Sequence, residues 1–220
     1  MPYILGLYMD AAARHHCLIY EGPPSRHLPA LSTAIVEKLE QNYRCLYLNS
    51  PQMVAGMRSY LAADGVDVLG ATAKGSLVLS SDQHHLRDGH FDVEGMLRAL
   101  EEAVQQALND GYAGLWATGD MTWEFGPEKD FTKLLEYEWR LDEFIQKHPE
   151  FGGVCHYHAD TLPREAMRQG LLTHPSVFIN ETLALINPHY IHRHAFTPQA
   201  EKSPEVESVL SRLLQLEFSI

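Results

Sequence analysis

The sequence predicts an α/β fold, a three-layer sandwich in which helices cover both faces of a mostly parallel central sheet. Three observations predict it. Short apolar runs alternate with longer segments that carry apolar residues at helical spacing, the pattern of consecutive βα units. The 220 residues suffice for one large domain with a full core. The composition, 45% hydrophobic and 21% charged, is that of an ordinary globular protein.

Apolar runs bounded by turn residues predict the strands. In chain order they are residues 17–20, 44–48, 66–69, 77–80, 114–118, 153–158, 177–179 and 183–186. The last two runs flank Asn180-Glu181 and are expected to form a small hairpin, whereas residues 82–90 are polar and loop-like.

Apolar residues at helical spacing predict the helices, which are residues 27–42, 51–63, 92–110, 130–148 and 163–172. Ser25 suits the N-cap of the first helix, and Pro29 lies in its first turn, where proline is tolerated. Gly65 and Gly111 follow the second and third helices and are expected to end them.

Both ends of the chain differ from the middle. We expect one domain over residues 1–196, then a segment over 197–220 that contains a polar, proline-bearing linker and an amphipathic helix. That helix needs a partner surface, on its own domain or on another subunit. Residues 3–9 are apolar and suit an edge strand or an interface. The two apolar segments favour a homodimer.

Charge and cysteine content narrow the class of protein. The net charge of −12 argues against direct nucleic-acid binding, which needs clustered Lys and Arg. The three cysteines, at positions 17, 45 and 155, form no C-x-x-C pair, so a reducing cytoplasm fits better than a disulfide framework. No signal peptide and no apolar run of membrane-spanning length is recognisable, so we expect a cytoplasmic protein without a membrane partner.

The run Gly153–His158 concentrates side chains that bind ligands. Alternation in a strand places Cys155 and Tyr157 on one face and His156 and His158 on the other. Strand ends are where α/β sheets place their binding sites. The alternative interpretation is a core cysteine and tyrosine beside two solvated histidines.

The turn after residue 20 occupies the position of a phosphate-binding loop but is poorly suited to that role. Pro23 and Pro24 remove two N–H donors, and the Gly-Lys-Ser/Thr motif is absent. Only the helix N-terminus and Arg26 remain to attract an anion. Asp120, at the end of the 114–118 strand, is therefore expected to orient a neighbour or line a pocket.

Aromatic and acidic residues follow Asp120. Trp123 suits the wall of an apolar cavity, with a core aromatic as the alternative. Glu136 and Glu138 lie on different faces of their helix, so one of them is expected to point inward and to need a polar partner.

When set against the requirements of a zinc site and of a hydrolase triad, the sequence favours neither. If zinc is bound, its expected ligands are His16, Cys155, His156 and His158, although alternation separates Cys155 from the two neighbouring histidines. No cofactor is otherwise predicted. A Ser-His-Asp hydrolase is not supported, because no G-x-S-x-G turn occurs.

Six short segments resemble one family. In chain order they are His16–Glu21, Arg44–Tyr47, Leu86–Asp92, Gly119–Trp123, Leu134–Glu138 and Cys155–Tyr157. Together they resemble the MEDS domain, the methanogen/methylotroph sensory domain of the dichloromethane regulator DcmR and related proteins. The resemblance implies a sensor of small hydrocarbon derivatives and a RecA/KaiC-like core that has lost its ATP site. It assigns family positions to His16, Tyr20, Cys155 and Tyr157, and His158 stands where the family usually has Asp.

The leading hypothesis is a non-catalytic sensory domain that binds a small organic molecule and signals through its C-terminal helix to a partner, either a kinase or a transcription regulator. The expected ligand-binding residues lie at the C-terminal ends of the central strands and are His16, Tyr20, Asp120, Trp123, Glu136, Cys155 and Tyr157. The alternatives are a Cys/His-based or metal-dependent enzyme, with Cys155 as nucleophile, and a degenerate RecA-like nucleotide-binding module.

Overall fold

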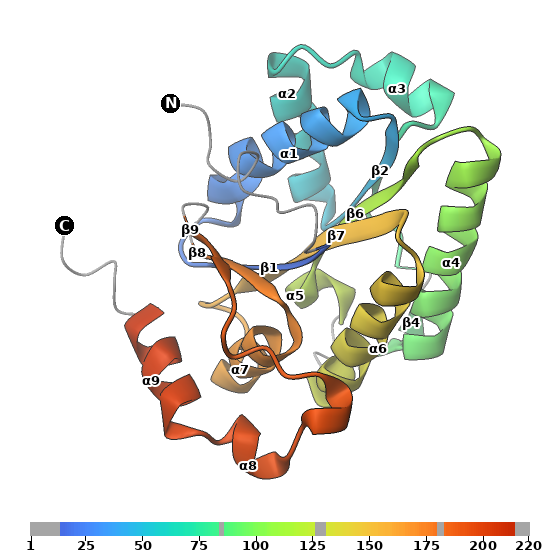
Figure 1. The fold of residues 1–220 in the computed structure, drawn as a ribbon. Coiled ribbons are helices and arrows are strands. Elements are labelled where there is room, and N and C mark those ends of the chain that lie inside the picture. The colour runs from blue at the N-terminus through green and yellow to red at the C-terminus, as the bar shows by residue number, and fades with distance from the viewer. Residues whose placement is uncertain (1–13, 84–85, 126–130, 180–182, 214–220) are drawn as a thin grey trace.

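The computed structural model describes residues 14–83, 86–125, 131–179 and 183–213 (Figure 1). Its central sheet has seven strands in the order β3-β2-β6-β7-β1-β8-β9. The strands are β1 (His15–Tyr20), β2 (Tyr43–Leu48), β3 (Leu77–Ser80), β6 (Gly114–Asp120), β7 (Phe151–His158), β8 (Ser176–Ile179) and β9 (Leu183–Ile186). All neighbouring pairs are parallel except β8 and β9, which are antiparallel.

Helices cover both faces of this sheet. One face, called here the α1 face, packs against the 3₁₀ helix η2 (Pro24–His27), α1 (Leu28–Glu40), α2 (Pro51–Ala63) and α3 (Val68–Lys74). The opposite α6 face packs against α4 (Val93–Asn109), α5 (Met121–Glu124), α6 (Leu134–Lys147), α7 (Arg164–Thr173) and α9 (Pro204–Leu213). In Figure 1, α1–α3 occupy the upper part of the molecule, and α6 and α7 the lower part. The predicted three-layer α/β sandwich is confirmed.

Short elements connect these layers. They are the hairpin of β4 (Leu86–Arg87) and β5 (His90–Phe91), the 3₁₀ turns η3 (Phe131–Lys133) and η4 (Arg193–Ala195), and α8 (Pro198–Glu201). No helix within the described ranges combines the length and apolar character needed to cross a membrane.

The two hydrophobic cores follow from strand alternation. Along β1, Cys17 and Ile19 belong to the core under α4, α6 and α7, whereas Leu18 and Tyr20 belong to the core under α1 and α2. All eight residues of β7 are buried, because this strand lies near the centre of the sheet with helices on both sides.

Most predicted elements are confirmed, with shifts of a few residues at their ends. The strand predicted at 66–69 is wrong, because Val68 starts helix α3 instead. The reason is local: the Asp67 side chain accepts a hydrogen bond of 3.0 Å from the Gly70 N–H and caps the helix. Residues 82–90 contain the β4–β5 hairpin rather than only loop.

Helix caps and chain ends bring further corrections. Ser25 does not cap α1, because it lies inside η2 and the helix starts after His27. The polar segment after Phe196 contains α8, which Thr197 caps through its hydroxyl. Beyond it, α9 buries Val206 and Leu210 in the α6-face core, so its partner surface is on its own chain. The apolar run at residues 3–9 and the turn at 180–181 lie outside the described residues.

β6 and β7 approach each other closely at Gly153. A Cβ atom at this position would lie 2.1 Å from the carbonyl oxygen of Ala117, and neither backbone can yield within a hydrogen-bonded sheet. Glycine is therefore required at the centre of the sheet for steric reasons.

We expect Gly153→Ala to lower the free energy of unfolding by about 1–3 kcal/mol, because the added methyl group overpacks the sheet. Urea denaturation monitored by circular dichroism measures this change. Gly95→Ala is the matched control: in α4 the new Cβ meets only the Asp92 side chain, which can rotate away. Equal losses in both variants would contradict the steric explanation.

Candidate functional site

The sheet separates the sequence-predicted site residues onto its two faces. His16 and Tyr20 point to the α1 face, where the His16 ring lies between Trp116 and Phe178. Cys155 and Tyr157 point to the α6 face. A single pocket at the strand ends that contains all of the predicted residues is therefore excluded, and each face has to be considered separately.

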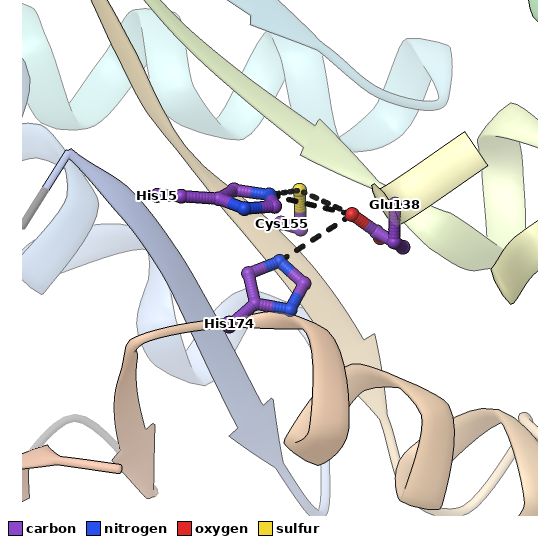
Figure 2. Close-up of side chains that lie close together, drawn as sticks. All are labelled: His15, Glu138, Cys155 and His174. Atoms are coloured by element: carbon purple, nitrogen blue, oxygen red, sulfur yellow. Dashed lines mark hydrogen bonds and ion pairs between the residues drawn. The ribbon is translucent and has the colours of Figure 1, made fainter. Parts of the chain in front are cut away.

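On the α6 face, four side chains form what we call the buried cluster: His15, Glu138, Cys155 and His174 (Figure 2). Their exposed fractions are between 0% and 5%. His15 Nε2 and His174 Nε2 lie 3.4 and 3.5 Å from the same carboxylate oxygen, Glu138 Oε2. Cys155 Sγ lies 3.8 Å from that oxygen and 3.9 Å from His15 Nε2.

Four different elements bring these side chains together. His15 starts β1, and Cys155 lies on the adjacent parallel strand β7, on the same face of the sheet. Glu138 lies on the inner side of α6, and His174 is the residue at which α7 ends. The cluster is thus formed jointly by the sheet and by the helices of the α6 face, and not by a single loop.

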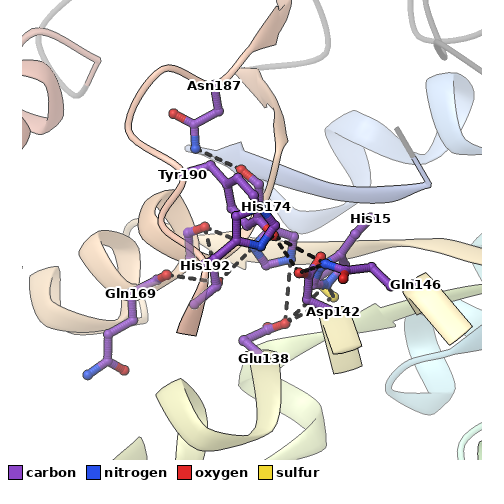
Figure 3. Close-up of polar contacts among 12 residues, drawn as sticks. His15, Glu138, Asp142, Gln146, Gln169, His174, Asn187, Tyr190 and His192 are labelled. Carbon is purple, nitrogen blue, oxygen red and sulfur yellow. Dashed lines mark hydrogen bonds and ion pairs between the residues drawn. The ribbon is translucent and has the colours of Figure 1, made fainter. Parts of the chain in front are cut away.

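Hydrogen bonds to residues outside the cluster fix His15, Glu138 and His174 (Figure 3). His15 Nδ1 lies 3.2 Å from Asp142 Oδ1, and His174 Nδ1 lies 2.8 Å from the carbonyl oxygen of Gly170. The Tyr157 hydroxyl donates to Glu138 Oε1. Gly170 also packs on the Tyr157 ring, since a Cβ atom there would lie 2.9 Å from two ring carbons.

A polar path leads outward from the cluster. The Tyr190 hydroxyl donates to Asp142 Oδ2 at 2.5 Å and lies 3.0 Å from Nδ1 of His192, which is exposed (Figure 3). Gln146 donates to the same carboxylate oxygen at 2.7 Å. Asp142 therefore links the buried cluster to the surface.

The pKa shifts within the cluster favour an ionised carboxylate at neutral pH. Burial alone would raise the pKa of Glu138, but His174, His15 and the Tyr157 hydroxyl together lower it. Burial would lower the pKa of His15, yet hydrogen bonds to Asp142 and Glu138 raise it above its ordinary value. Burial and the neighbouring His15 lower the pKa of His174 to about 4. At neutral pH the favoured state is an ionised Glu138 beside a neutral His174.

An internal cavity of about 30 Å³ adjoins the cluster. His15 and Cys155 form one part of its wall. The remaining wall is mainly apolar and includes Leu48, Met96, Leu100, Ala117, Tyr137, Leu141, Ile145 and Phe151. A buried apolar space with a thiol and an imidazole at its edge suits a very small molecule with one polar group.

On the α1 face, a more open cleft of about 470 Å³ lies at the C-terminal ends of the strands. The Tyr20 hydroxyl donates to Asp120 Oδ2 there at 3.0 Å, and the ring of His158 stacks on Tyr20. None of the described residues lining this cleft is Lys or Arg. The Gly22 N–H donates to Asp160 at 2.9 Å, and Pro23 and Pro24 have no N–H. This geometry is unfavourable for phosphate groups.

Two buried histidines lie below that cleft. His27 packs between the rings of Tyr20 and His156, with centroids 4.2 and 5.3 Å away. Neither ring nitrogen of His27 or His156 has a hydrogen-bond partner among the described residues. Burial, followed by the neighbouring His158, lowers the pKa of His27 to about 3, so this ring is neutral in the folded protein.

Several sequence predictions need correction at this point. The zinc set of His16, Cys155, His156 and His158 cannot form, because Cys155 lies on the opposite face from the three histidines. His156 and His158 are buried rather than solvated. His16 Nδ1 lies 3.0 Å from the Ser176 hydroxyl and is remote from the cluster's face.

Of the two glutamates weighed on α6, Glu138 points inward, whereas Glu136 is exposed and outside the cluster. Tyr20 and Asp120 do lie together, as do Cys155 and Tyr157. The Trp123 side chain lies outside what the structure describes.

Sequence reasoning missed His15, Asp142, His174 and Tyr190. A signal existed for Asp142, because it follows Glu138 by four residues and so shares its face of the helix. His15 shares a strand face with Cys17, but the partner strand could not be known without the register. No sequence signal marked His174 or Tyr190.

Comparison with known families decides where the chain belongs. The sequence model described as MEDS, the methanogen/methylotroph, DcmR sensory domain, matches residues 14–175. The chain belongs to the MEDS family. This MEDS domain includes all four residues of the buried cluster within the matched range. No curated protein matches the chain.

Solved structures show the fold of this MEDS domain. The KaiC-like protein PH0186 from the hyperthermophilic archaeon Pyrococcus horikoshii OT3 superposes with a TM-score of 0.52 at 13% identity, over 75% of this chain and 70% of that chain. The uncharacterized protein PH0321 from Pyrococcus horikoshii, solved in complex with an unknown peptide, gives 0.54 at 15% identity, over 75% and 76%. The MEDS domain therefore has a KaiC-like α/β fold, as the sequence resemblance implied.

The buried neutral histidines make stability depend on pH. The unfolded chain protonates His27 near pH 6.5, whereas the folded protein does so only near pH 3. The neutral His27 therefore makes its full contribution to the free energy of unfolding above pH 6.5. That contribution is lost as the pH falls towards 3, by up to ~1.4 kcal/mol per pH unit for each such histidine.

We expect His27→Phe to flatten this decline in the free energy of unfolding between pH 6.5 and 4.5 in urea titrations. His90→Phe, at an exposed site, should leave the slope unchanged. An unchanged slope in His27→Phe would contradict the neutral, buried state of His27.

Proposed function

We propose that this MEDS domain is a non-catalytic sensor that binds a small organic molecule, a hydrocarbon derivative with very few carbon atoms, in the cavity on the α6 face. Family membership supports the sensory role. The observation that carries the choice of ligand is the cavity itself, which is buried, mainly apolar and bounded by His15 and Cys155.

The size of the cavity limits the ligand. One water molecule needs about 10–15 Å³ measured in this way, so about 30 Å³ holds a molecule of only a few non-hydrogen atoms. Nucleotides and sugars are far too large. Burial of the ligand's apolar atoms supplies the affinity, and His15 and Cys155 orient its polar or halogen atom.

A continuous route connects the cavity with the C-terminal helix. His174 ends α7, and the same helix carries Arg164 and Arg168, which both pair with Glu207 of α9. A shift of the buried cluster on ligand binding would move α7 and therefore α9. We propose that a partner protein, a kinase or a transcription regulator, detects that movement.

The geometry supports binding rather than turnover. The Cys155 thiol is buried and donates to the Glu138 carboxylate, and both burial and the neighbouring anion oppose formation of the nucleophilic thiolate, although His15 lies 3.9 Å away. The cleft at the strand ends contains Asp120 and none of the cationic side chains that hold a triphosphate. We therefore rank the enzyme and the nucleotide-binding module below the sensor.

Filling the cavity tests the proposed ligand site. We expect dichloromethane or methanol to shift the NMR signals of methyl groups that line the cavity, such as those of Leu100 and Leu141, and Ala117→Val to abolish these shifts by occupying the space. The matched control is Ala103→Val on α4, which packs against the core but does not line the cavity. Shifts confined to residues of the strand-end cleft, or equal loss in both variants, would overturn this assignment.

Breaking the contact between α7 and α9 tests the route. In Glu207→Gln we expect the amides of α9 to exchange with solvent about two- to fivefold faster, consistent with ion pairs worth ~0.5–1 kcal/mol. The probe should still bind, but its effect on α9 exchange should vanish. Glu205→Gln, on the same helix but bonded only to Ser203 among the described contacts, is the control. A preserved ligand effect in Glu207→Gln would exclude this route.

A further inference from the structure

We propose that His15, Glu138, Cys155 and His174 bind one divalent transition-metal ion, with zinc as the ion that best matches this set of ligands. The proposal stands on the geometry of these four side chains. It does not depend on the nature of the organic ligand, and it uses a set different from the one that the sequence suggested.

The distances agree with a tetrahedral site. Zinc bonds of about 2.0–2.3 Å place the ligand atoms of a tetrahedron about 3.3–3.8 Å apart. The four measured separations within the buried cluster are 3.4, 3.5, 3.8 and 3.9 Å, and all four ligand atoms lie within 4.8 Å of one another (Figure 2). These four separations need to contract by no more than a few tenths of an ångström, and the remaining pairs, which lie up to 4.8 Å apart, by up to about 1–1.5 Å.

The outer hydrogen bonds are those of a metal centre. A histidine ligand typically donates its second ring N–H to a carboxylate or a backbone carbonyl, and a carboxylate ligand is itself hydrogen-bonded. Here His15 Nδ1 faces Asp142 (Figure 3). His174 Nδ1 faces the Gly170 carbonyl, and the second oxygen of Glu138 accepts from Tyr157. These contacts leave Nε2 of both histidines directed at the same point.

One of those nitrogens has no hydrogen-bond partner. His174 Nε2 is fully buried and unbonded among the described residues. Its other nitrogen lies 2.8 Å from a carbonyl oxygen, which can only accept, so Nδ1 carries a proton and, in the neutral ring, Nε2 carries a lone pair. That lone pair faces Glu138 Oε2 at 3.5 Å, which brings two electron-rich atoms together. A proton on Nε2 or a cation between the two atoms resolves this contact, and the cation would in addition engage His15 Nε2 and Cys155 Sγ, which lie beside the same oxygen.

The donor types select the ion. A thiolate, two imidazoles and one carboxylate suit zinc and its neighbours, whereas calcium and magnesium require oxygen ligands. With the thiol proton released to solvent, Cys155 and Glu138 supply two negative charges, which balance a divalent cation in a site that excludes water. His15 and Cys155 also line the cavity, so a molecule bound there would touch two ligands of the metal.

The test uses the full chain, purified without a polyhistidine tag, stripped with a chelator and reloaded with Zn²⁺ or Co²⁺ alone. We expect one ion per chain by elemental analysis. We also expect Co²⁺ to give a thiolate-to-cobalt charge-transfer band, together with the strong visible bands of tetrahedral cobalt. Exposed histidines such as His192 and His194 can bind zinc adventitiously, but they cannot produce a thiolate band.

Matched variants separate this site from the rest of the chain. Cys155→Ser and His174→Gln should weaken binding by more than about 100-fold and abolish the thiolate band or its tetrahedral pattern. Asp142→Asn, which changes an outer partner, should cost about 10–100-fold. Cys45→Ser and His156→Gln, buried on the α1 face, should bind as the unchanged chain does.

X-ray absorption of the unsubstituted, zinc-loaded chain tests the metal site even when a variant does not fold. One sulfur and three nitrogen or oxygen neighbours are expected. Absence of a bound ion, absence of sulfur around it, or equal effects of Cys155→Ser and Cys45→Ser would overturn the proposal. These readouts contain no organic ligand, so failure of the metal site and failure of the sensory function can be distinguished.

Discussion

The structure depends on holding one carboxylate, that of Glu138, ionised in the middle of the protein. Removing such a group from water costs several kcal/mol, and only close hydrogen bonds and opposite charge repay it. The compensating groups come from separate elements: Tyr157 from β7, His15 from β1 and His174 from the end of α7. Satisfying Glu138 therefore fixes α6 against the sheet and α7 against both.

The two faces of the sheet treat their polar groups differently. Parallel strands buried on both sides are usually apolar, yet the central strands here carry four buried histidines, His15, His16, His156 and His158. On the α6 face, His15 is integrated into a closed, charged cluster beside a small cavity. On the α1 face, His156 stays neutral below an open cleft. We proposed the ligand site on the first face because, among the described residues, the small cavity there adjoins a charged cluster.

Periodicity predicted the layers and the faces, but not the neighbours. Alternation placed Cys155 and His156 on opposite faces, and this was correct because it is local to one strand. Predicting that His15, and not His16, lies beside Cys155 requires knowing that β1 pairs with β7. Predicting that Glu138, and not Glu136, joins the cluster requires knowing the rotation of α6 about its axis. Both are set by tertiary packing. Val68 was mistaken for a strand residue because a single cap at Asp67 outweighs the strand preference of a short apolar run. His174 acquires its role only because α7 ends beside Glu138.

The contact between Gly170 and Tyr157 has a consequence for how the domain tolerates mutation. Because the ring leaves no room for a Cβ atom, any other residue at position 170 would displace α7 as a rigid unit. Two contacts of that helix would change: His174, at its C-terminal end, would withdraw from Glu138, and Arg168, in its middle, would shift away from Glu207. A mutational scan would therefore mark Gly170 as highly sensitive to substitution, although it has no side chain. The alignment of His174 with Glu138, and of Arg168 with Glu207, thus rests on the smallest residue in the helix.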